Sequence, residues 1–279
     1  NRLCLCWLFV FHNLLACVGI NKMRIYNITE INQLSLNGHV GMSNETSQQW
    51  KVSTRENGHI VVDVLERPKP QQHAEAELYG LLDEVNKVID RVEFGFDRSD
   101  KLTVYNSHEI AERYLVCREK LKERYGSDQS IMQLLEIVGQ SVNDFGQEMR
   151  SSLVYYTLWS WFGGGKSFHL IPLSILHANH YLDAMIVRKK KEKLEDGTIH
   201  LMESGTGELD DVSGFQQVFA KEILPLTSGH YSYSVDTEFF CAEDYQPFFD
   251  KAVTFVKEQA SEDYVYTNRI EFKLVEDKV

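Results

Sequence analysis

The sequence predicts an α+β fold in which largely antiparallel sheets, built from hairpins, are interleaved with amphipathic helices. Alternating apolar segments meet at tight-turn sequences such as Asn57-Gly58 and Asp196-Gly197. Between these segments, apolar residues recur every three or four positions, which is typical of helices. The regular strand–helix–strand crossovers of a doubly wound parallel sheet are missing from this pattern. With 279 residues, 43% of them hydrophobic, the chain can bury a sizeable core.

Residues 1–22 allow two interpretations. In the first, Met23 is the true start and the preceding residues are a leader or artefact outside the fold, which we favour because His12 and Asn13 interrupt the apolar run. The chain would then be cytoplasmic. In the second, Arg2 and the following apolar residues form a bacterial export signal that ends in a lipoprotein-like box at Cys17. The protein would then be exported or lipid-anchored in the bacterial envelope.

The first segments of the body predict one hairpin and one helix. We expect a short strand and a loop over 23–46, where alternation is weak, and then a hairpin of 50–54 and 60–64 around Asn57-Gly58. Pro68 and Pro70 end the sheet segment. Apolar residues at helical spacing over 78–89 predict a helix, and alternation at 92–96 and 102–105 predicts a second hairpin.

Two further helices follow. Asn106 or Ser107 can cap a helix that buries Ile110, Tyr114, Cys117 and Leu121 and stops at Gly126. The next helix starts near Ser127 or Asp128 and extends to Met149. Its internal glycines, Gly139 and Gly146, predict close packing against a neighbour, because glycine otherwise weakens a helix by about 1 kcal/mol relative to alanine.

The stretch 151–182 carries a single formal charge, Lys166, and forms the expected centre of the core. Its apolar run, 153–162, is shorter than the about 20 residues that a transmembrane helix needs, so we expect no transmembrane span. Downstream, we expect a hairpin of 184–187 and 198–203, a loop at 204–207, helices over 212–223 and 247–256, and strands over 231–240 and 270–274.

These elements suggest four regions: a leader over 1–22, an N-terminal α+β half over 23–126, a connecting helix over 127–149, and a C-terminal α+β half over 150–279. A single continuous domain is the alternative, since no internal repeat separates the halves.

Charge and composition make several function classes improbable. A net charge of −12 disfavours nucleic acid, whose binding depends on clustered basic residues. The one dense basic run, 188–193, is typical of a lysine-protected strand edge. Five cysteines without a Cys-x-x-Cys pair, and histidines at 169, 177 and 180 without ligand spacing, predict no metal and no cofactor.

The glycines at 163–165 with Lys166 and Ser167 end like a phosphate-binding loop, but Ser160 replaces its first glycine and no helix is expected to follow. No nucleophile motif occurs, so we predict no catalytic residue and favour a non-enzyme. The aromatic cluster of 155–162 is expected in the core. It could also bind a ligand, through Trp159, Trp161, Phe162 and Lys166.

The leading functional prediction is therefore a non-catalytic binding or scaffolding protein with a protein partner. The first alternative is a carrier of a small apolar ligand in an internal cavity beside 150–162. The second is a hydrolase-type enzyme whose carboxylates meet only in the folded chain.

Overall fold

A computed structural model describes most of the chain. The described residues are 22–67, 76–97, 102–146, 149, 152–163, 186–207, 209, 211, 213–217, 231–242, 247–261 and 263–275. Residues 1–21 of the predicted leader 1–22, including Cys17, lie outside them, as do Lys166 and the histidines at 169, 177 and 180. The predictions made for these residues stay predictions.

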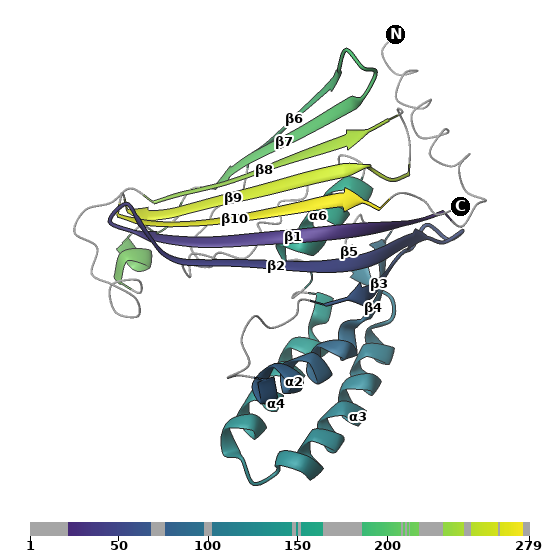
Figure 1. Ribbon diagram of the computed structural model, residues 1–279, viewed down its shortest axis with the longest axis vertical. Helices are drawn as coiled ribbons and strands as arrows, with labels where there is room; N and C mark the ends of the chain where they lie inside the picture. Colours follow the sequence, from purple (N-terminus) through teal and green to yellow (C-terminus); the bar gives the residue numbers. More distant parts are fainter. Residues whose placement is uncertain are drawn as a thin grey trace.

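Ten strands in the described part of the chain form one antiparallel sheet (Figure 1). Its strand order is β5-β4-β3-β2-β1-β10-β9-β8-β7-β6. The strands are β1 (Met23–Leu36), β2 (His39–Thr54), β3 (Ile60–Glu66), β4 (Arg91–Phe96), β5 (Leu102–Val104), β6 (Ile186–Lys193), β7 (Ile199–Gly207), β8 (Ser232–Cys241), β9 (Lys251–Ser261) and β10 (Tyr264–Leu274).

The pairing of β1 with β10 joins the first strand to the last. Tyr26 lies opposite Leu274 and Leu36 lies opposite Tyr264, so the two strands pair over eleven consecutive positions. On its other side β1 pairs with β2. The strands near both ends of the described chain therefore occupy the middle of the sheet.

Tight turns set the register of three hairpins. Asn37 and Gly38 both have positive φ, as the favoured two-residue hairpin turn requires. Gly58 and Gly197 also have positive φ, and Asp196 accepts a hydrogen bond from the backbone nitrogen of Thr198 (2.9 Å). The hairpins predicted at Asn57-Gly58 and Asp196-Gly197 are confirmed. The second predicted hairpin, of 92–96 with 102–105, also forms, and its strands pair over 94–96 and 102–104.

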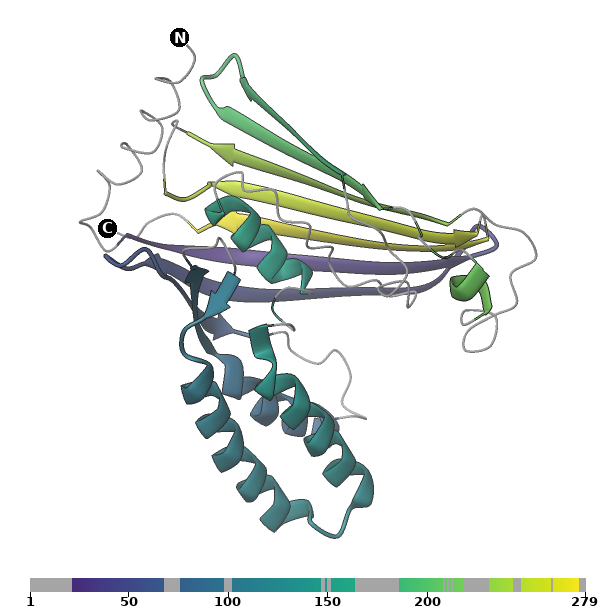
Figure 2. The same ribbon diagram turned by 180° about the vertical axis from the view of Figure 1, so that it is seen from behind.

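Helix α6 (Leu153–Phe162) packs on one face of the sheet, which we call the inner face (Figure 2). Residues 153–160 are all buried. Alternate residues of the central strands meet the helix, and their rings pack closely: the centroid of Trp50 lies 5.0 Å from that of Tyr155. The main core therefore lies between α6 and the inner face.

A short chain of hydroxyl groups crosses this core. The hydroxyl of Thr157 donates to the carbonyl of Leu153 (3.1 Å) and lies 2.7 Å from the hydroxyl of Thr254. Thr254 lies in turn 3.2 Å from the hydroxyl of Thr237. Buried hydroxyls need such partners, because an unpaired one costs about 1–3 kcal/mol.

Helices α2 (Ala76–Asn86), α3 (Ser107–Tyr125) and α4 (Gln129–Asn143) form a group at one end of the sheet, near β3, β4 and β5 (Figure 1). A short 3₁₀ turn, η2 (Lys87–Ile89), follows α2. The helix predicted to start near Ser127 or Asp128 begins as α4 at Gln129, and Asp128 caps it by accepting from the backbone nitrogens of Ser130 and Ile131. α4 ends at Asn143, before the predicted end at Met149. A small core between the helices contains Leu81, Val85, Leu121 and Leu135.

The predicted close packing at Gly139 is confirmed. A Cβ added there would lie 2.9 Å from the hydroxyl oxygen of Tyr114, which no ordinary Cβ tolerates. That hydroxyl donates to the carbonyl of Leu135, one turn earlier on α4. Glycine at 139 thus lets α3 and α4 approach closely.

The prediction of a short strand and a loop over 23–46 is wrong. This region forms β1 and the first part of β2, strands of 14 and 16 residues. Their backbone groups are satisfied by pairing on neighbouring strands, which does not require alternating side chains. The turn sequence Asn37-Gly38 was the one local indication of a hairpin in this region.

Two downstream predictions are also wrong. Residues 251–261, expected mostly in a helix over 247–256, form β9, in which Ala252, Thr254, Val256, Glu258 and Ala260 are buried alternately. Residues 204–207, expected as a loop, continue β7. The predicted strand 231–240 is confirmed from Ser232 onward in β8, and the predicted strand 270–274 is confirmed as the last part of β10. Of the helix expected over 212–223, residues 213–217 are described, and they are helical.

The architecture is thus a large antiparallel sheet with helices, with more sheet than the predicted alternation of hairpins and helices implied. Strands from both predicted halves share this sheet. The division into an N-terminal half, a connecting helix and a C-terminal half stays a prediction.

Candidate functional site

The aromatic residues predicted to bind a ligand contact other parts of the protein. Trp159 is only 2% exposed, and its ring lies 4.7 Å from that of Tyr156. Trp161 is half-buried and donates from Nε1 to the carbonyl of Pro247 (3.1 Å). Phe162 is half-buried and packs edge-on against Phe248. These contacts account for the three side chains as core residues, and a ligand-binding role for them stays a prediction.

A polar pocket of about 760 Å³ lies on the opposite, outer face of the sheet. The register places its residues there. Lys51 and Ser53 of β2 lie opposite Asp63 and Val61 of β3, between inner-facing neighbours such as Val52. Arg91 of β4 lies opposite Asp63. We call this the outer pocket, lined by Met23, Lys51, Ser53, Thr54, Arg55, Glu56, Asn57, Val61, Asp63 and Arg91.

Asp63 holds two of the cations of the outer pocket. Its carboxylate oxygens lie 2.9 Å from Nζ of Lys51 and 2.7 Å from Nη1 of Arg91. The Asp63 side chain is 17% exposed, whereas Lys51 and Arg91 are 35% and 42% exposed. The carboxylate is therefore enclosed by its partners, while the cations reach solvent.

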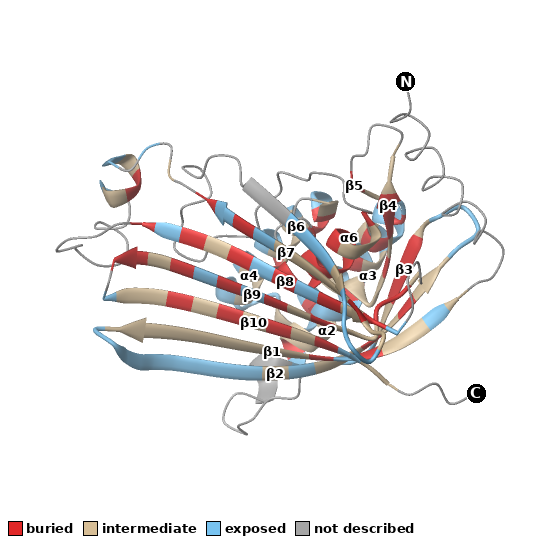
Figure 3. Cartoon of the chain, turned by 90° about the horizontal axis from the view of Figure 1, so that it is seen from above, coloured by how far each residue is buried: buried red, intermediate tan, exposed pale blue. Residues whose placement is uncertain are grey.

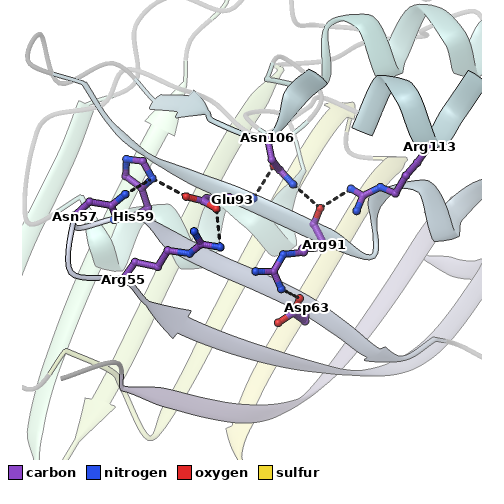
Figure 4. A network of polar contacts seen from close by, with 8 residues as sticks. All are labelled: Arg55, Asn57, His59, Asp63, Arg91, Glu93, Asn106 and Arg113. Carbon is purple, nitrogen blue, oxygen red and sulfur yellow. Dashed lines mark hydrogen bonds and ion pairs between the residues drawn. The ribbon is translucent and has the colours of Figure 1, made fainter. Parts of the chain in front are cut away.

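Glu93, next to the pocket, holds the third cation in the same way (Figure 4). One of its carboxylate oxygens lies 3.1 Å from Nη2 of Arg55, and the other lies 2.7 Å from Nδ1 of His59. The imidazole of His59 stacks on the ring of Tyr105, with 3.7 Å between centroids. Nδ1 also lies 3.0 Å from Nδ2 of Asn57.

Behind this network, buried Asn106 fixes the backbone of β4 (Figure 4). Its Oδ1 accepts from the backbone nitrogen of Glu93 (2.8 Å), and its Nδ2 donates to the carbonyl of Arg91 (3.0 Å). Nη2 of Arg113, on α3, donates to the same carbonyl (2.8 Å). Asn106 does occupy the N-cap position of α3, as predicted, but its side chain makes no capping hydrogen bond.

The two guanidinium groups of the outer pocket keep N–H groups that their ion pairs do not use. Each guanidinium has five N–H groups, and the ion pairs above use one nitrogen each of Arg55 and Arg91. Asp63 and Glu93 each already accept from two side chains. The arrangement can therefore accept an anionic group between cations that their ion pairs already orient.

Catalytic chemistry has less support in this arrangement. The His59–Glu93 pair resembles a base with its orienting carboxylate, but among the described residues the imidazole makes no hydrogen bond to a Ser, Thr or Cys nucleophile. Among the same residues, no group of three His, Cys, Asp or Glu side chains could hold a metal ion.

Sequence reasoning missed the outer pocket. The residues Lys51, Ser53 and Arg55 do alternate along the chain, as outward-facing residues of a strand should. Nothing local shows that they lie beside Asp63 and Arg91, because that depends on the registers of two successive strand pairs.

Comparison with models of known protein families finds no match, and a search of curated proteins finds no significantly similar sequence. Within the described ranges, no helix is both long and apolar enough to cross a membrane.

Proposed function

We propose that this protein is a non-catalytic binding protein whose outer pocket binds a carboxylate-bearing ligand. The single observation behind the proposal is the set of three cations, Lys51, Arg55 and Arg91, held by carboxylates around a pocket of about 760 Å³ with donors to spare. Guanidinium groups match carboxylates especially well, since two parallel N–H groups can meet both oxygens.

Pre-organisation supports this role. Ion pairs between exposed side chains add little stability, typically about 0–1 kcal/mol. Asp63 and Glu93 do, however, restrict the rotamers of the cations, so a ligand need not order these side chains on binding. Asn106 and Arg113 fix the β4 backbone that carries Arg91 and Glu93.

The local charge points the same way. The outer pocket is lined by three basic residues and two acidic ones, Glu56 and Asp63, and Glu93 beside it pairs with Arg55, so the local net charge is 3 − 3 = 0. The whole chain carries −12. An anionic ligand is repelled by most of this surface and is best tolerated at the pocket, which favours selective rather than general binding.

The alternative of an apolar-ligand carrier has weaker support. A carrier needs an enclosed apolar cavity of roughly 300–1,000 Å³. Residues 153–160 of α6 are instead buried against protein rings, and the outer pocket is open and polar.

A carboxylate can come from a small molecule or from an acidic segment of a protein, and the second source corresponds to the scaffolding role.

Isothermal titration calorimetry with citrate and with an oligoglutamate peptide tests the proposal and separates these sources. Replacing Arg55 and Arg91 together by glutamine should weaken binding of the active probe at least tenfold, because each charged hydrogen bond contributes about 1.5–3 kcal/mol. Arg118→Gln is the control, since Arg118 is also 42% exposed and ion-paired, with Glu119 on α3.

Binding should also weaken as salt is added, because exposed charges are screened. Binding of citrate alone would identify a small-molecule site, and binding of the peptide alone would identify a protein partner. If neither probe binds, or if the double variant binds as tightly as the wild type, the proposal is wrong.

A further inference from the structure

One long segment of strand edge has no neighbouring strand among the described residues. β3 pairs with β2 only from Gln49 to Thr54, so residues 39–48 of β2 pair on one side only, with β1. Figure 3 shows this part of β2 as a pale blue border of the sheet. Residues 39–45 are all exposed. We call residues 39–48 the open edge.

The other border of the sheet shows how an edge is normally protected. β6 is the last strand on that side and carries Lys189, Lys190, Lys191 and Lys193. Lysines at an edge discourage pairing with another chain, because their charges would be brought together and desolvated. β6 is therefore a guarded edge.

The open edge lacks this protection. Its ten residues contain no Lys, Arg or Pro, and Glu45 is its only formally charged residue. Val40 and Met42 are 58% and 54% exposed. A bulge interrupts it at Gly41, because Met42 lies opposite Leu34 while Val40 lies opposite Ser35. Backbone groups that face away from β1 along this edge can pair with an added strand.

We propose that the open edge pairs antiparallel with the open edge of a second copy of this chain. A two-fold axis at Met42 places His39 of one copy opposite Glu45 of the other, because both lie three residues from Met42. The same register places Val40 opposite Asn44 and sets the two Met42 side chains against each other. A two-fold arrangement forms each contact twice, so a His39–Glu45 pair forms at each end of the paired segment.

Self-pairing fits this edge better than pairing with β6 of another copy or with a basic strand. A lysine-rich strand would satisfy Glu45 but would set its other charges against Val40 and Met42. An acidic strand would face Glu45 with like charge, which is unfavourable between directly opposed residues. The self-paired register has opposite or neutral residues at every position from 39 to 45.

The expected dimer is weak. Pairing covers residues 39–45 of each copy, a smaller contact than the roughly 1,200 Å² at the lower end of stable, specific interfaces. Dimerisation should therefore depend on protein concentration and be reversible. It leaves the outer pocket on β2–β4 outside the paired segment, so failure of the dimer would not affect the proposed ligand binding, and the reverse also holds.

Sedimentation velocity of the full chain in reducing buffer, over a wide concentration range, tests the proposal. Met42→Lys should weaken the dimer at least tenfold, because it sets two ammonium groups face to face. Val116→Lys, which adds the same charge at an exposed apolar residue of α3, should leave it unchanged. Thermal melts of both variants check that the fold is retained.

A charge exchange adds a test that does not depend on loss alone. Glu45→Lys should weaken the dimer, and adding His39→Glu should restore it. Hydrogen exchange should slow at the amides of the open edge as wild-type concentration rises. A wild type that stays monomeric at all concentrations would overturn the proposal, as would a dimer that Met42→Lys leaves intact or that the second substitution fails to restore.

Discussion

Replacing Gly139 by alanine tests how tightly α3 and α4 pack. The added Cβ would lie 2.9 Å from the hydroxyl oxygen of Tyr114 and 3.1–3.2 Å from two of its ring carbons. Tyr114 cannot simply swing away, because it is buried and its hydroxyl donates to the carbonyl of Leu135. The two helices must therefore separate, or the tyrosine must move and lose its hydrogen bond.

The expected change in the free energy of unfolding combines three contributions. Alanine in place of glycine in a helix stabilises by about 1 kcal/mol. Overpacking a close contact costs about 1–3 kcal/mol, and a weakened hydrogen bond costs about 1 kcal/mol more. We therefore expect Gly139→Ala to destabilise the protein by about 1–3 kcal/mol.

Gly80 provides the matched control, since it also lies in a helix, α2, but an added Cβ would meet nothing within 4 Å. Gly80→Ala should stabilise by about 0.5–1 kcal/mol. Urea denaturation followed by circular dichroism measures both variants. In the background of Tyr114→Phe, the cost of Gly139→Ala should fall, because the closest atom is gone. Equal stabilisation by Gly139→Ala and Gly80→Ala would refute this account of the helix contact.

Two further predictions concern buried polar groups of the inner face. Thr254→Val should lower the free energy of unfolding by about 1–3 kcal/mol in urea denaturation, because the buried hydroxyl of Thr237 loses its partner. The control Thr267→Val, at a half-exposed residue, should change it by less than about 0.5 kcal/mol. Similar values for the two variants would contradict the hydroxyl chain. Burial, with the nearby Glu30 carboxylate, raises the pKa of Tyr266 to about 12, so the neutral form is favoured in the folded state. An unfolded tyrosine ionises near pH 10, so ionisation favours the unfolded state above that pH. The free energy of unfolding of the wild type should therefore fall relative to that of Tyr266→Phe as pH rises from about 10 to 12. A difference that stays constant over this range would contradict the raised pKa.

Local chemistry in the sequence determined the turns and the helices of the N-terminal part. Asn57-Gly58 and Asp196-Gly197 set two hairpins because glycine readily takes the positive φ that these turns require. Asp128 begins α4 because its carboxylate meets two free backbone nitrogens. Each of these features depends on residues within a few positions of one another, so the order of residues suffices to predict it.

Some segments have a residue pattern that fits both a helix and a strand, and only the tertiary structure decides between the two. Residues 248–256 present apolar side chains at helical spacing, but Ala252, Thr254 and Val256 also alternate. Pairing with β8 and β10 on both sides decides for a strand, and it places the alternate residues in the core. Likewise, the polar first part of β2 is a strand through its pairing with β1, which its side chains do not indicate.

The outer pocket and the open edge depend on the tertiary structure in the same way. Lys51 and Arg91 are separated by forty positions in sequence, and only the registers of β2, β3 and β4 bring them to the same carboxylate of Asp63. The sequence by itself determined the lysine-rich edge and the tight turns, which are properties of short segments. Which strand lies beside which, and therefore which charges meet and which edge stays open, was decided by pairing between distant segments, because backbone hydrogen bonds carry no sequence code of their own.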